Sequence, residues 1–344
     1  MSVRVAVVGL GMMGTTHFKG YQAIPEAKVV AVCDVESRKR AGDWAAAAGN
    51  IDTGAAQRTD LSALKVYGSL ARLLKDPDVD VVDLCVPTFR HASMAIAALR
   101  AGKHVLCEKP ISLVSRQAQR MIKAADESGR MLAVGHVLRF WPEYVAMKQM
   151  IKDGRYGKVR SMWLGRFSAR PGWSWDNWLQ NSKRSGSAAL DLHIHDADTA
   201  LWFFGPPDAV SAAGTEDPGG GLGHITATYH YAGGPVVVAE GGWDYPAAFP
   251  FRMEARILFE RAAVEYSSAR TPTLTVYGET PGQVENPPVT QADGYTEELR
   301  YFIRCVSESR RPERLSPANA LAAVRLVEAE VKAARRGRPV RVGA

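Results

Sequence analysis

The stretch VRVAVVGLGMMG, residues 3–14, decides the fold of the N-terminal part of the chain. It begins with a short valine-rich run of the kind that forms a strand buried in a parallel sheet. It ends in Gly9, Gly11 and Gly14, which have the spacing GxGxxG. Because this spacing follows a strand and opens a helix predicted for residues 12–24, its context is that of a dinucleotide-binding turn.

Each glycine has its own task in such a turn. The first allows a tight turn, the second lets the backbone approach a pyrophosphate, and the third lets the helix pack on the strand. Backbone N–H groups at the start of the helix, where Met12 and Met13 lie, would face the phosphates. The alternative is a glycine turn that binds nothing. We expect the three glycines, Met12 and Met13 to bind the cofactor.

A second strand-like run, KVVAVCD, ends in Asp34, 20 residues after Gly14. A carboxylate at this place accepts hydrogen bonds from the adenosine ribose hydroxyls, and it would repel a 2′-phosphate. The sequence therefore favours NAD over NADP. Arg38 is also expected near the cofactor, and its positive charge is the one feature here that would suit NADP.

Strands and helices keep alternating up to residue 136. Predicted helices cover residues 36–48, 69–76, 91–102 and 115–129, and predicted strands cover 78–87, 103–110 and 130–136. This order indicates a doubly wound parallel sheet, the Rossmann fold, in which ligands lie beyond the carboxyl ends of the strands. Further residues expected at the cofactor on this ground are Pro87, Thr88, His91, Glu108 and Lys109.

The run HVLCEKPIS, residues 104–112, places a glutamate, a lysine and a proline directly after a strand-like stretch. One interpretation is a solvated surface turn, since proline stops a strand and charges favour water. The other is an active-site lysine on a rigid corner. Because Lys109 is predicted to lie at the same sheet edge as the glycine turn, we favour the second interpretation.

After residue 140 the pattern changes. An amphipathic helix is predicted for residues 141–154, and the runs 223–231 and 252–260 alternate with a period of two. Such alternation indicates an open, mostly antiparallel sheet with one face buried against helices. Two helices, about 293–310 and 316–336, close the chain.

We thus expect two domains. An NAD-binding Rossmann domain is predicted for residues 1–137, and an α+β domain for substrate binding and oligomerisation is predicted for residues 138–344. The C-terminal helix of the second would be able to pack back on the first.

Acidic and histidine side chains gather in SGSAALDLHIHDADTALWFFG, residues 185–205. If the stretch is one helix, Asp191 and His195 lie one turn apart on the same face, and His193 points elsewhere. This arrangement suits a carboxylate that orients a histidine general base. Two alternatives are a capped helix with a buried histidine and a metal site of the His-x-His type.

Trp173, Trp175 and Arg139 are further candidates for the substrate site. Sugars commonly stack on aromatic rings, and RPGWSWDNW offers several of them just before the histidine segment. Hydrophobic anchoring of a long loop explains the tryptophans equally well. Arg139 follows the last predicted Rossmann strand, so it would line the same cleft.

The order of these motifs resembles the Gfo/Idh/MocA oxidoreductases, named after glucose–fructose oxidoreductase and inositol 2-dehydrogenase. The resemblance covers GxGxxG, EKP about 100 residues later, and D-x-x-x-H after about 80 more. It implies that Lys109, Asp191 and His195 form the catalytic group, and that the 109–110 peptide bond is cis. The family often has three glycines before the aspartate, where this chain has Ser185-Gly186-Ser187.

The resemblance also implies an activity. We expect an NAD-dependent dehydrogenase that oxidises a secondary hydroxyl of a sugar or cyclitol, with no metal, as a homodimer or homotetramer formed through the C-terminal sheet. An NAD-dependent glycosidase and a non-catalytic dinucleotide-sensing or sugar-sensing regulator are the alternatives on this fold.

Composition narrows the classes further. The 344 residues are 46% hydrophobic and 23% charged, and no run suggests a membrane span. The net charge of +7 is dispersed, which argues against a nucleic-acid partner. Four widely spaced cysteines indicate reduced thiols, and together with the absence of a signal peptide they suggest a cytoplasmic protein.

Overall fold

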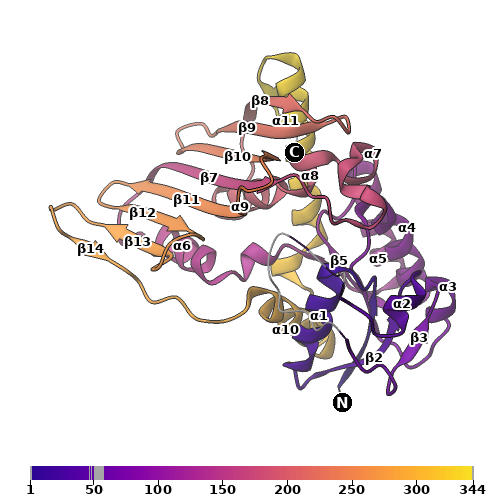
Figure 1. Cartoon of the computed structure of the whole chain (residues 1–344). Helices are drawn as coiled ribbons and strands as arrows, with labels where there is room; N and C mark the ends of the chain where they lie inside the picture. The colour runs from indigo at the N-terminus through magenta and orange to yellow at the C-terminus, as the bar shows by residue number, and fades with distance from the viewer. Residues whose placement is uncertain (1, 46, 48, 50–57, 343–344) are drawn as a thin grey trace. The chain divides into compact units, whose positions relative to one another are not determined.

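The computed structural model describes the whole chain except residues 1, 46, 48, 50–57 and 343–344. The described chain forms two compact units (Figure 1). The first consists of Met1–Val137, Trp173–Trp178 and Asp293–Leu321, and the second of Leu138–Gly172, Leu179–Ala292 and Ala322–Ala344.

The first unit contains a six-stranded sheet with the order β3-β2-β1-β4-β5-β6. All of its strand pairs are parallel. Its elements are β1 (Val3–Val8), α1 (Met12–Gln22), β2 (Ala27–Cys33), α2 (Ser37–Arg40), β3 (Lys65–Tyr67), α3 (Leu70–Leu73), β4 (Val81–Leu84), α4 (Thr88–Arg100), β5 (His104–Glu108), α5 (Ser115–Ser128), β6 (Leu132–Gly135), α10 (Gly294–Ser307) and η3 (Glu313–Leu315).

Burial explains why these strands are nearly all apolar. All four residues of β4 and of β6 are buried, as are five of six in β1, because helices cover both faces of a doubly wound sheet. Helix α1 packs against α10, and α4 packs against α5. The predicted Rossmann sheet is therefore confirmed.

The second unit contains a nine-stranded sheet with the order β14-β13-β12-β11-β7-β10-β9-β8-β15. Its pairs are antiparallel except β7 with β10, so the sheet is mixed and mostly antiparallel, as expected. Its strands are β7 (Val159–Ala169), β8 (Ala209–Glu216), β9 (Leu222–His230), β10 (Val236–Tyr245), β11 (Arg252–Phe259), β12 (Ala263–Ser267), β13 (Leu274–Tyr277), β14 (Val284–Glu285) and β15 (Val340–Arg341).

Helices α8 and α9 pack against the central strands of this sheet. The remaining elements of the chain are η1 (Val137–Arg139), α6 (Pro142–Asp153), η2 (Trp175–Gln180), α7 (Ser182–Ser185), α8 (Ser187–Asp191), α9 (Ile194–Phe204) and α11 (Pro317–Arg336). Along β9 and β11 buried residues alternate with more exposed ones, which is the signature of a sheet with one face covered.

Three predictions about local structure need correction. The helix predicted for residues 36–48 ends at Arg40, although positions 46 and 48 lie outside the described residues. Gly42 follows with φ +81°, and a Cβ there would lie 2.0 Å from the carbonyl oxygen of Thr59, so a close backbone contact replaces the helix.

The second correction concerns β3, an edge strand that the sequence analysis did not predict. Its three residues are exposed or half-buried, so it carries no apolar run to indicate a strand. The third concerns residues 185–205, which form α8 and α9 separated by a turn at Leu192 and His193 rather than one helix.

All four cysteines are free thiols, as the sequence predicted. Among the described residues, no helix is long and apolar enough to cross a membrane.

Candidate active site

The glycine turn joins β1 to α1 and has the geometry of a phosphate cradle. Gly9 has φ +89°, and a Cβ on it would lie 2.4 Å from the carbonyl oxygen of Cys85. A Cβ on Gly14 would lie 1.7 Å from the carbonyl oxygen of Gly9. These two glycines are therefore required by the packing of the chain itself.

Gly11 is different, because a Cβ on it would meet nothing within 4 Å. The packing of the described chain does not require a glycine here, whereas the close approach of a pyrophosphate does. Gly11 is also the N-cap of α1, and no side chain of the described residues caps this helix end. The turn thus fits a dinucleotide, whose phosphates would accept from the N–H groups of the first helical turn, at Met12 and Met13.

Asp34 follows β2 and lies beside the glycine turn. Its Oδ2 accepts a hydrogen bond from Leu10 N at 2.7 Å, and its Oδ1 accepts from Glu36 N at 2.8 Å. Each oxygen keeps a second lone pair, so the carboxylate can still accept from a ribose hydroxyl. Asp34 therefore shapes the turn whether or not it also binds ribose, which stays a prediction.

Two arginines lie near the end of β2. Arg38 is half-exposed and pairs with Glu36 at 3.2 Å. Arg40, which the sequence analysis did not single out, donates to the carbonyl oxygens of Asp34 and Val35 at 2.9 and 2.8 Å. The signal that could have found it is the run SRKR directly after the acidic end of the strand. The role of Arg38 at a cofactor stays a prediction.

Pro87, Thr88 and His91 lie at the start of α4, directly after the β4–α4 connection. Pro87 is the N-cap of α4, and Thr88 is its first residue. His91 is buried, with Nδ1 at 2.7 Å from the carbonyl oxygen of Pro110 and Nε2 at 2.8 Å from that of Val86. The ring thus braces the corner after β5 against the start of α4, and direct contact of these three residues with a cofactor stays a prediction.

Lys109 stands where β5 ends, at the carboxyl edge of the same sheet as the glycine turn. Its backbone N–H donates to Oε2 of Glu108 at 3.1 Å. The peptide bond to Pro110 is cis, as the resemblance implied. Within residues 105–112 every residue is buried except Lys109, which is partly exposed.

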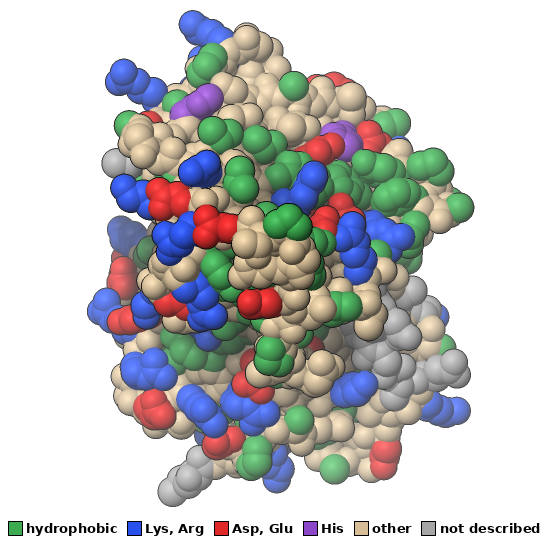
Figure 2. All heavy atoms as spheres, turned by 90° about the vertical axis from the view of Figure 1, so that its left-hand side faces the viewer, with side chains coloured by type: hydrophobic (Ala, Val, Ile, Leu, Met, Phe, Trp, Pro, Cys, Tyr) green, Lys and Arg blue, Asp and Glu red, His purple; other side chains and the backbone are tan. Residues whose placement is uncertain are grey.

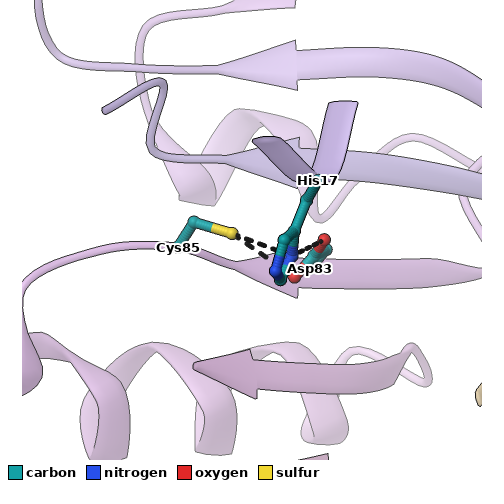
Figure 3. Close-up of side chains that lie close together, drawn as sticks. All are labelled: His17, Asp83 and Cys85. Carbon is teal, nitrogen blue, oxygen red and sulfur yellow. Dashed lines mark hydrogen bonds and ion pairs between the residues drawn. The ribbon is translucent and has the colours of Figure 1, made fainter. Parts of the chain in front are cut away.

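A buried cluster lies directly behind Glu108. Oε1 of Glu108 lies 3.1 Å from Nε2 of His17. Nδ1 of the same histidine lies 2.9 Å from Oδ2 of Asp83. Figure 3 shows the His17 side chain, which comes from α1, pointing toward Asp83 and Cys85, which lie at the end of β4. The carboxylate of Glu108 is engaged in this cluster and with Lys109 N, and its contact with a cofactor stays a prediction.

The second unit carries Asp191 and His195. Asp191 is the last residue of α8, and His195 lies in the first turn of α9. Between them the helical pattern widens, because His193 N donates to the carbonyl oxygen of Ala188, five residues earlier, at 2.9 Å. The expectation of one continuous helix is wrong for this reason, and the pairing of Asp191 with His195 stays a prediction.

Burial distinguishes these two residues from their neighbours. Within residues 187–200 every residue is buried except Asp191 and His195, which are partly exposed. The turn before them uses left-handed backbone at Gly186 (φ +81°) and Ser187 (φ +63°), which explains why small residues stand here. Ser185 Oγ supports the turn by accepting from Ser187 N at 3.0 Å.

Helix α9 is fixed by two buried ion pairs. Arg166 of β7 donates twice to Asp196, at 2.9 and 3.1 Å, and Arg139 donates twice to Asp198, at 2.9 and 2.8 Å. Arg139 is only 5% exposed. The structure thus gives Arg139 an anchoring contact, and its expected role as a substrate ligand stays a prediction.

The sequence analysis did not single out Arg166. Its signal is a charged residue at the third buried position of an alternating strand, after Met162 and Leu164. A charge at such a position requires a buried partner.

His193 is engaged away from Asp191 and His195. Its Nε2 lies 2.9 Å from Oε2 of Glu330 on α11, and Tyr229 donates its hydroxyl to Oε1 of Glu330 at 2.8 Å. Burial by itself would lower the pKa of His193, but the Glu330 carboxylate outweighs it and raises that pKa. Among the described residues, two groups of side chains could hold a metal ion. Both contain His17, and neither contains His193 or His195.

Trp173 and Trp175 are 38% and 44% exposed, and they lie at the entrance to η2. Exposure of this extent is more than a buried loop anchor would have. Stacking of a sugar on these rings stays a prediction.

Comparison with known proteins adds to this picture. The model of the family described as "Oxidoreductase family, NAD-binding Rossmann fold" matches residues 3–136, and that described as "GFO/IDH/MocA C-terminal domain" matches residues 144–279. The chain is 32% identical over 205 residues to myo-inositol 2-dehydrogenase of Thermotoga maritima, covering 59% of this chain and 55% of that protein. It is 34% identical over 174 residues to 1,5-anhydro-D-fructose reductase of Ensifer adhaerens, covering 49% of this chain and 51% of that protein. The chain thus spans about half the length of the curated relatives that it matches.

Solved structures show the same fold over the full length. Levoglucosan dehydrogenase in complex with NADH and levoglucosan has a TM-score of 0.84 at 20% identity, and 100% of each chain is covered. The WlbA dehydrogenase from Bordetella pertussis in complex with NADH and UDP-GlcNAcA has a TM-score of 0.82 at 22% identity, again with 100% of each chain covered. At these identities the likeness shows the fold alone.

Proposed function

This chain belongs to the Gfo/Idh/MocA oxidoreductase family, and from this premise we propose that it is an NAD-dependent dehydrogenase oxidising a secondary hydroxyl of a sugar or cyclitol. One observation carries the proposal. Lys109, Asp191 and His195 are the partly exposed residues in two stretches, 105–112 and 187–200, whose other residues are all buried. A chain that only needed these segments as core would not keep polar side chains accessible at those three positions.

The glycine turn between β1 and α1 is the reason for proposing NAD as the cofactor. Gly9, Gly11 and Gly14 would hold the pyrophosphate at the start of α1, and Asp34 would accept from the adenosine ribose. NAD, when bound, supplies the acceptor for the hydride that leaves the carbinol carbon. The relatives and structural neighbours named above act on or bind cyclitols and sugars, which supports this substrate class without selecting one member.

The chain's own groups handle the proton and the charge. Oxidation of a carbinol releases the hydroxyl proton, and the proposal gives this proton to the imidazole of His195. Asp191 would hold the ring in one tautomer and stabilise the imidazolium that forms. Lys109 would donate a hydrogen bond to the reacting oxygen and stabilise the developing alkoxide charge.

A panel of sugars and cyclitols, including myo-inositol and levoglucosan, tests the proposal. Each is offered with NAD and with NADP, and reduction is followed by the absorbance of the reduced nicotinamide. We expect turnover with NAD on at least one of them. Cleavage of a glycosidic bond without net NADH would favour a glycosidase, and NAD binding without turnover on the whole panel would favour a regulator.

The Lys109→Met variant tests the site within this proposal. It should fold and bind NAD while kcat falls at least about tenfold, roughly 1.4 kcal/mol of barrier. Lys123→Met is the matched control, because Lys123 is 76% exposed on α5. If both variants behave alike, Lys109 is a solvated turn residue.

We also propose that the open face of the second unit's sheet joins two or four copies of the chain. This face carries an aromatic cluster, in which the Phe167 ring lies 5.4 Å from Tyr245 and 6.4 Å from His224, with Tyr245 4.3 Å from Phe249. Figure 2 shows one face of the molecule, on which hydrophobic side chains gather among histidine and acidic ones. Apolar clusters on a sheet face commonly mark interfaces. Light scattering that gives the mass of a monomer at micromolar concentration would contradict this assignment.

A further inference from the structure

A chain of buried ionisable side chains runs through the first unit to the Lys109 corner, and nothing in the proposed mechanism uses it. It starts at Asp83 in β4, passes through His17 in α1, and reaches Glu108 at the end of β5. The side chains of His17 and Asp83 are fully buried, and that of Glu108 is 9% exposed. Glu298 of α10 adds a fourth ionisable group, also with 0% exposure.

The two ring nitrogens of His17 face opposite carboxylates. Nδ1 lies 2.9 Å from Oδ2 of Asp83, and Nε2 lies 3.1 Å from Oε1 of Glu108. The Nδ1 contact is a hydrogen bond, whereas the Nε2 contact is close enough for an ion pair but lacks hydrogen-bond geometry. A ring placed between two carboxylates in this way is stabilised as the imidazolium.

The electrostatics agree with this protonation state. Burial by itself would lower the pKa of His17, but Cys85 and Asp83 raise it well above its usual value. Burial raises the pKa of the Cys85 thiol as well. The pKa of Glu108 is raised by burial but lowered more by His17, and its net direction is down.

Glu108 connects His17 to the backbone of Lys109. Its Oε1 is held by His17, and its Oε2 accepts the backbone N–H of Lys109 at 3.1 Å. Gly135, opposite Glu108 on β6, leaves room for this carboxylate, since a Cβ there would lie 3.3 Å from Oε1. The glutamate of EKP is thus a two-sided connector between a buried cation and the backbone that carries the lysine.

We propose that His17 is a positioning residue for the reaction: anchored by Asp83, it fixes Glu108 and, through Glu108, the backbone from which Lys109 reaches the reacting oxygen. This inference rests on the proposed role of Lys109. Positioning of this kind matters because a displacement of about 1 Å at a catalytic group can cost about 100-fold in rate.

Two substitutions of the same residue separate the two contacts of the ring. His17→Gln places an amide N–H near the position of Nε2, so it keeps a donor for Glu108 and loses Asp83. His17→Asn places its amide near Nδ1, so it keeps Asp83 and loses Glu108. We expect His17→Asn to lower kcat about 10- to 100-fold and His17→Gln to lower it clearly less. The Kd for NADH should stay within about threefold in both, because the described contacts of the glycine turn do not include His17.

A purely structural role gives a different pattern. In that case the two variants would lose kcat in proportion to their loss of thermal stability, and equal kcat values for Asn and Gln would overturn the proposal. His104→Gln is the matched control: it makes the same change at the other end of β5, where His104 Nδ1 accepts only from Met131 N. It should leave kcat unchanged.

Hydrogen exchange gives a readout that needs no substrate. The Lys109 amide should exchange faster in His17→Asn than in wild type, with His17→Gln between them and His104→Gln unchanged. If the wild type turns over no member of the sugar panel but this order holds, the proposed function fails and the positioning network stands. If turnover is found but exchange at Lys109 is the same in all variants, the network proposal fails alone.

Metal analysis of the purified protein tests the alternative that the cluster binds a metal ion. His17, Asp83 and Cys85, or His17, Glu108 and Glu298, have ligand atoms within 4.8 Å of one another. One equivalent of zinc in the wild type that is lost in the His17 variants would make the cluster a metal centre and overturn the proposal that His17 positions Glu108 as an ion-pair partner. Absence of bound metal together with the kinetic order above supports it.

Discussion

The segments that carry Lys109 and His195 are held in place by two different kinds of buried charge. Behind Lys109 lie a histidine and carboxylates, namely His17, Asp83 and Glu108. Around α9, the helix of His195, lie two arginines, each donating twice to one aspartate. The first kind of anchor is built on a histidine, a side chain that can lose its proton, whereas the guanidinium of arginine stays charged at every pH that a protein survives.

This difference teaches which part of the site should respond to pH and which should respond only to mutation. The arginine–aspartate ion pairs stay charged over the whole working pH range. Helix α9 should therefore keep its position when His195 gains or loses a proton. The His17 cluster is conditional, because Glu298 sits beside it with a carboxyl pKa that burial and then the charge of Glu108 raise well above the usual value. Each prediction below breaks one anchor or one group that depends on it.

Removal of the proposed base should have the largest effect. Because α9 is anchored by Asp196 and Asp198, His195→Ala should fold normally while kcat falls by about 10²–10⁴-fold. Oxidation needs neutral histidine, so kcat/KM in the wild type should rise with pH through one ionisation that the variant lacks. Steady-state kinetics across pH measure both.

Two companion variants test the pairing that the structure leaves open. Asp191→Asn should also lower kcat. Its loss should not add to that of His195→Ala, because the proposed pair would act as a unit. His193→Ala should instead lower stability, since it leaves Glu330 buried without its histidine. Loss of activity to a chelator together with an equal kinetic effect of His193→Ala would assign a metal site and remove His195 from the role of base.

Breaking an arginine anchor should have the next largest effect. Arg166→Met leaves Asp196 as an unpaired buried charge, which typically costs about 3–5 kcal/mol of unfolding free energy. The double variant Arg166→Met, Asp196→Leu should recover most of this loss, because an apolar pair of similar volume needs no compensating charge. Urea unfolding of the three proteins measures the difference.

The matched control for this pair lies on the surface. Arg155 also contacts an aspartate, Asp153, but it is 53% exposed, so Arg155→Met should cost no more than about 1 kcal/mol. Equal costs for Arg166→Met and Arg155→Met would show that the buried pair is not an anchor.

Local patterns in the sequence identified most of the first unit. The glycine turn, the acidic end of β2 and the EKP corner follow from residues within a few positions of one another, and a parallel sheet brings strand ends to one edge regardless of the detailed packing. The strand β3 was missed because an exposed edge strand of three residues has no apolar signature. The helix after β2 was overextended because the contact of Gly42 with Thr59 is not visible in local propensity.

The anchors could not be predicted because their partners are far apart in the chain. Arg166 and Asp196 are 30 residues apart, and His193 and Glu330 are 137 apart. A sequence can show that a charge at a buried strand position needs a partner, but it cannot say which one. The turn between α8 and α9 was missed for a related reason, since the backbone angles at Leu192 and His193 stay in the helical region and only the hydrogen bonds change.

Changing Asp34 should have an intermediate effect, confined to cofactor binding. Asp34→Ser removes acceptors for the ribose and for the Leu10 and Glu36 N–H groups, so KM for NAD should rise about 10- to 100-fold, the equivalent of one or two hydrogen bonds to a charged group. Asp34→Asn keeps one acceptor oxygen and should lie between. A wild type that prefers NADP, or a serine variant with the wild-type cofactor preference, would show that Asp34 shapes the turn only.

The smallest expected effect is a change in how stability depends on pH, and it separates the conditional anchor from the permanent one. Burial and then the charge of Glu108 raise the pKa of the Glu298 carboxyl in the folded protein well above the usual value near 4.5. Because the same carboxyl has its usual pKa in the unfolded chain, folding takes up protons at this group above about pH 4.5.

Stability from this group is therefore complete below about pH 4.5 and is lost as pH rises toward the folded pKa, with a slope of at most about 1.4 kcal/mol per pH unit for one proton. His17 contributes with the same sign, since its folded pKa is also raised, and Asp83, Glu108 and Asp293 are the other charges that act on Glu298.

Glu298→Gln removes only the contribution of Glu298 to this pH dependence. As pH rises above about 4.5, its melting temperature should fall less steeply than that of the wild type. Glu297→Gln, the neighbouring exposed position, should follow the wild-type curve. Parallel curves for Glu298→Gln and wild type would mean that Glu298 takes up no proton on folding, and the cluster behind Lys109 would then be as permanent as the arginine pairs.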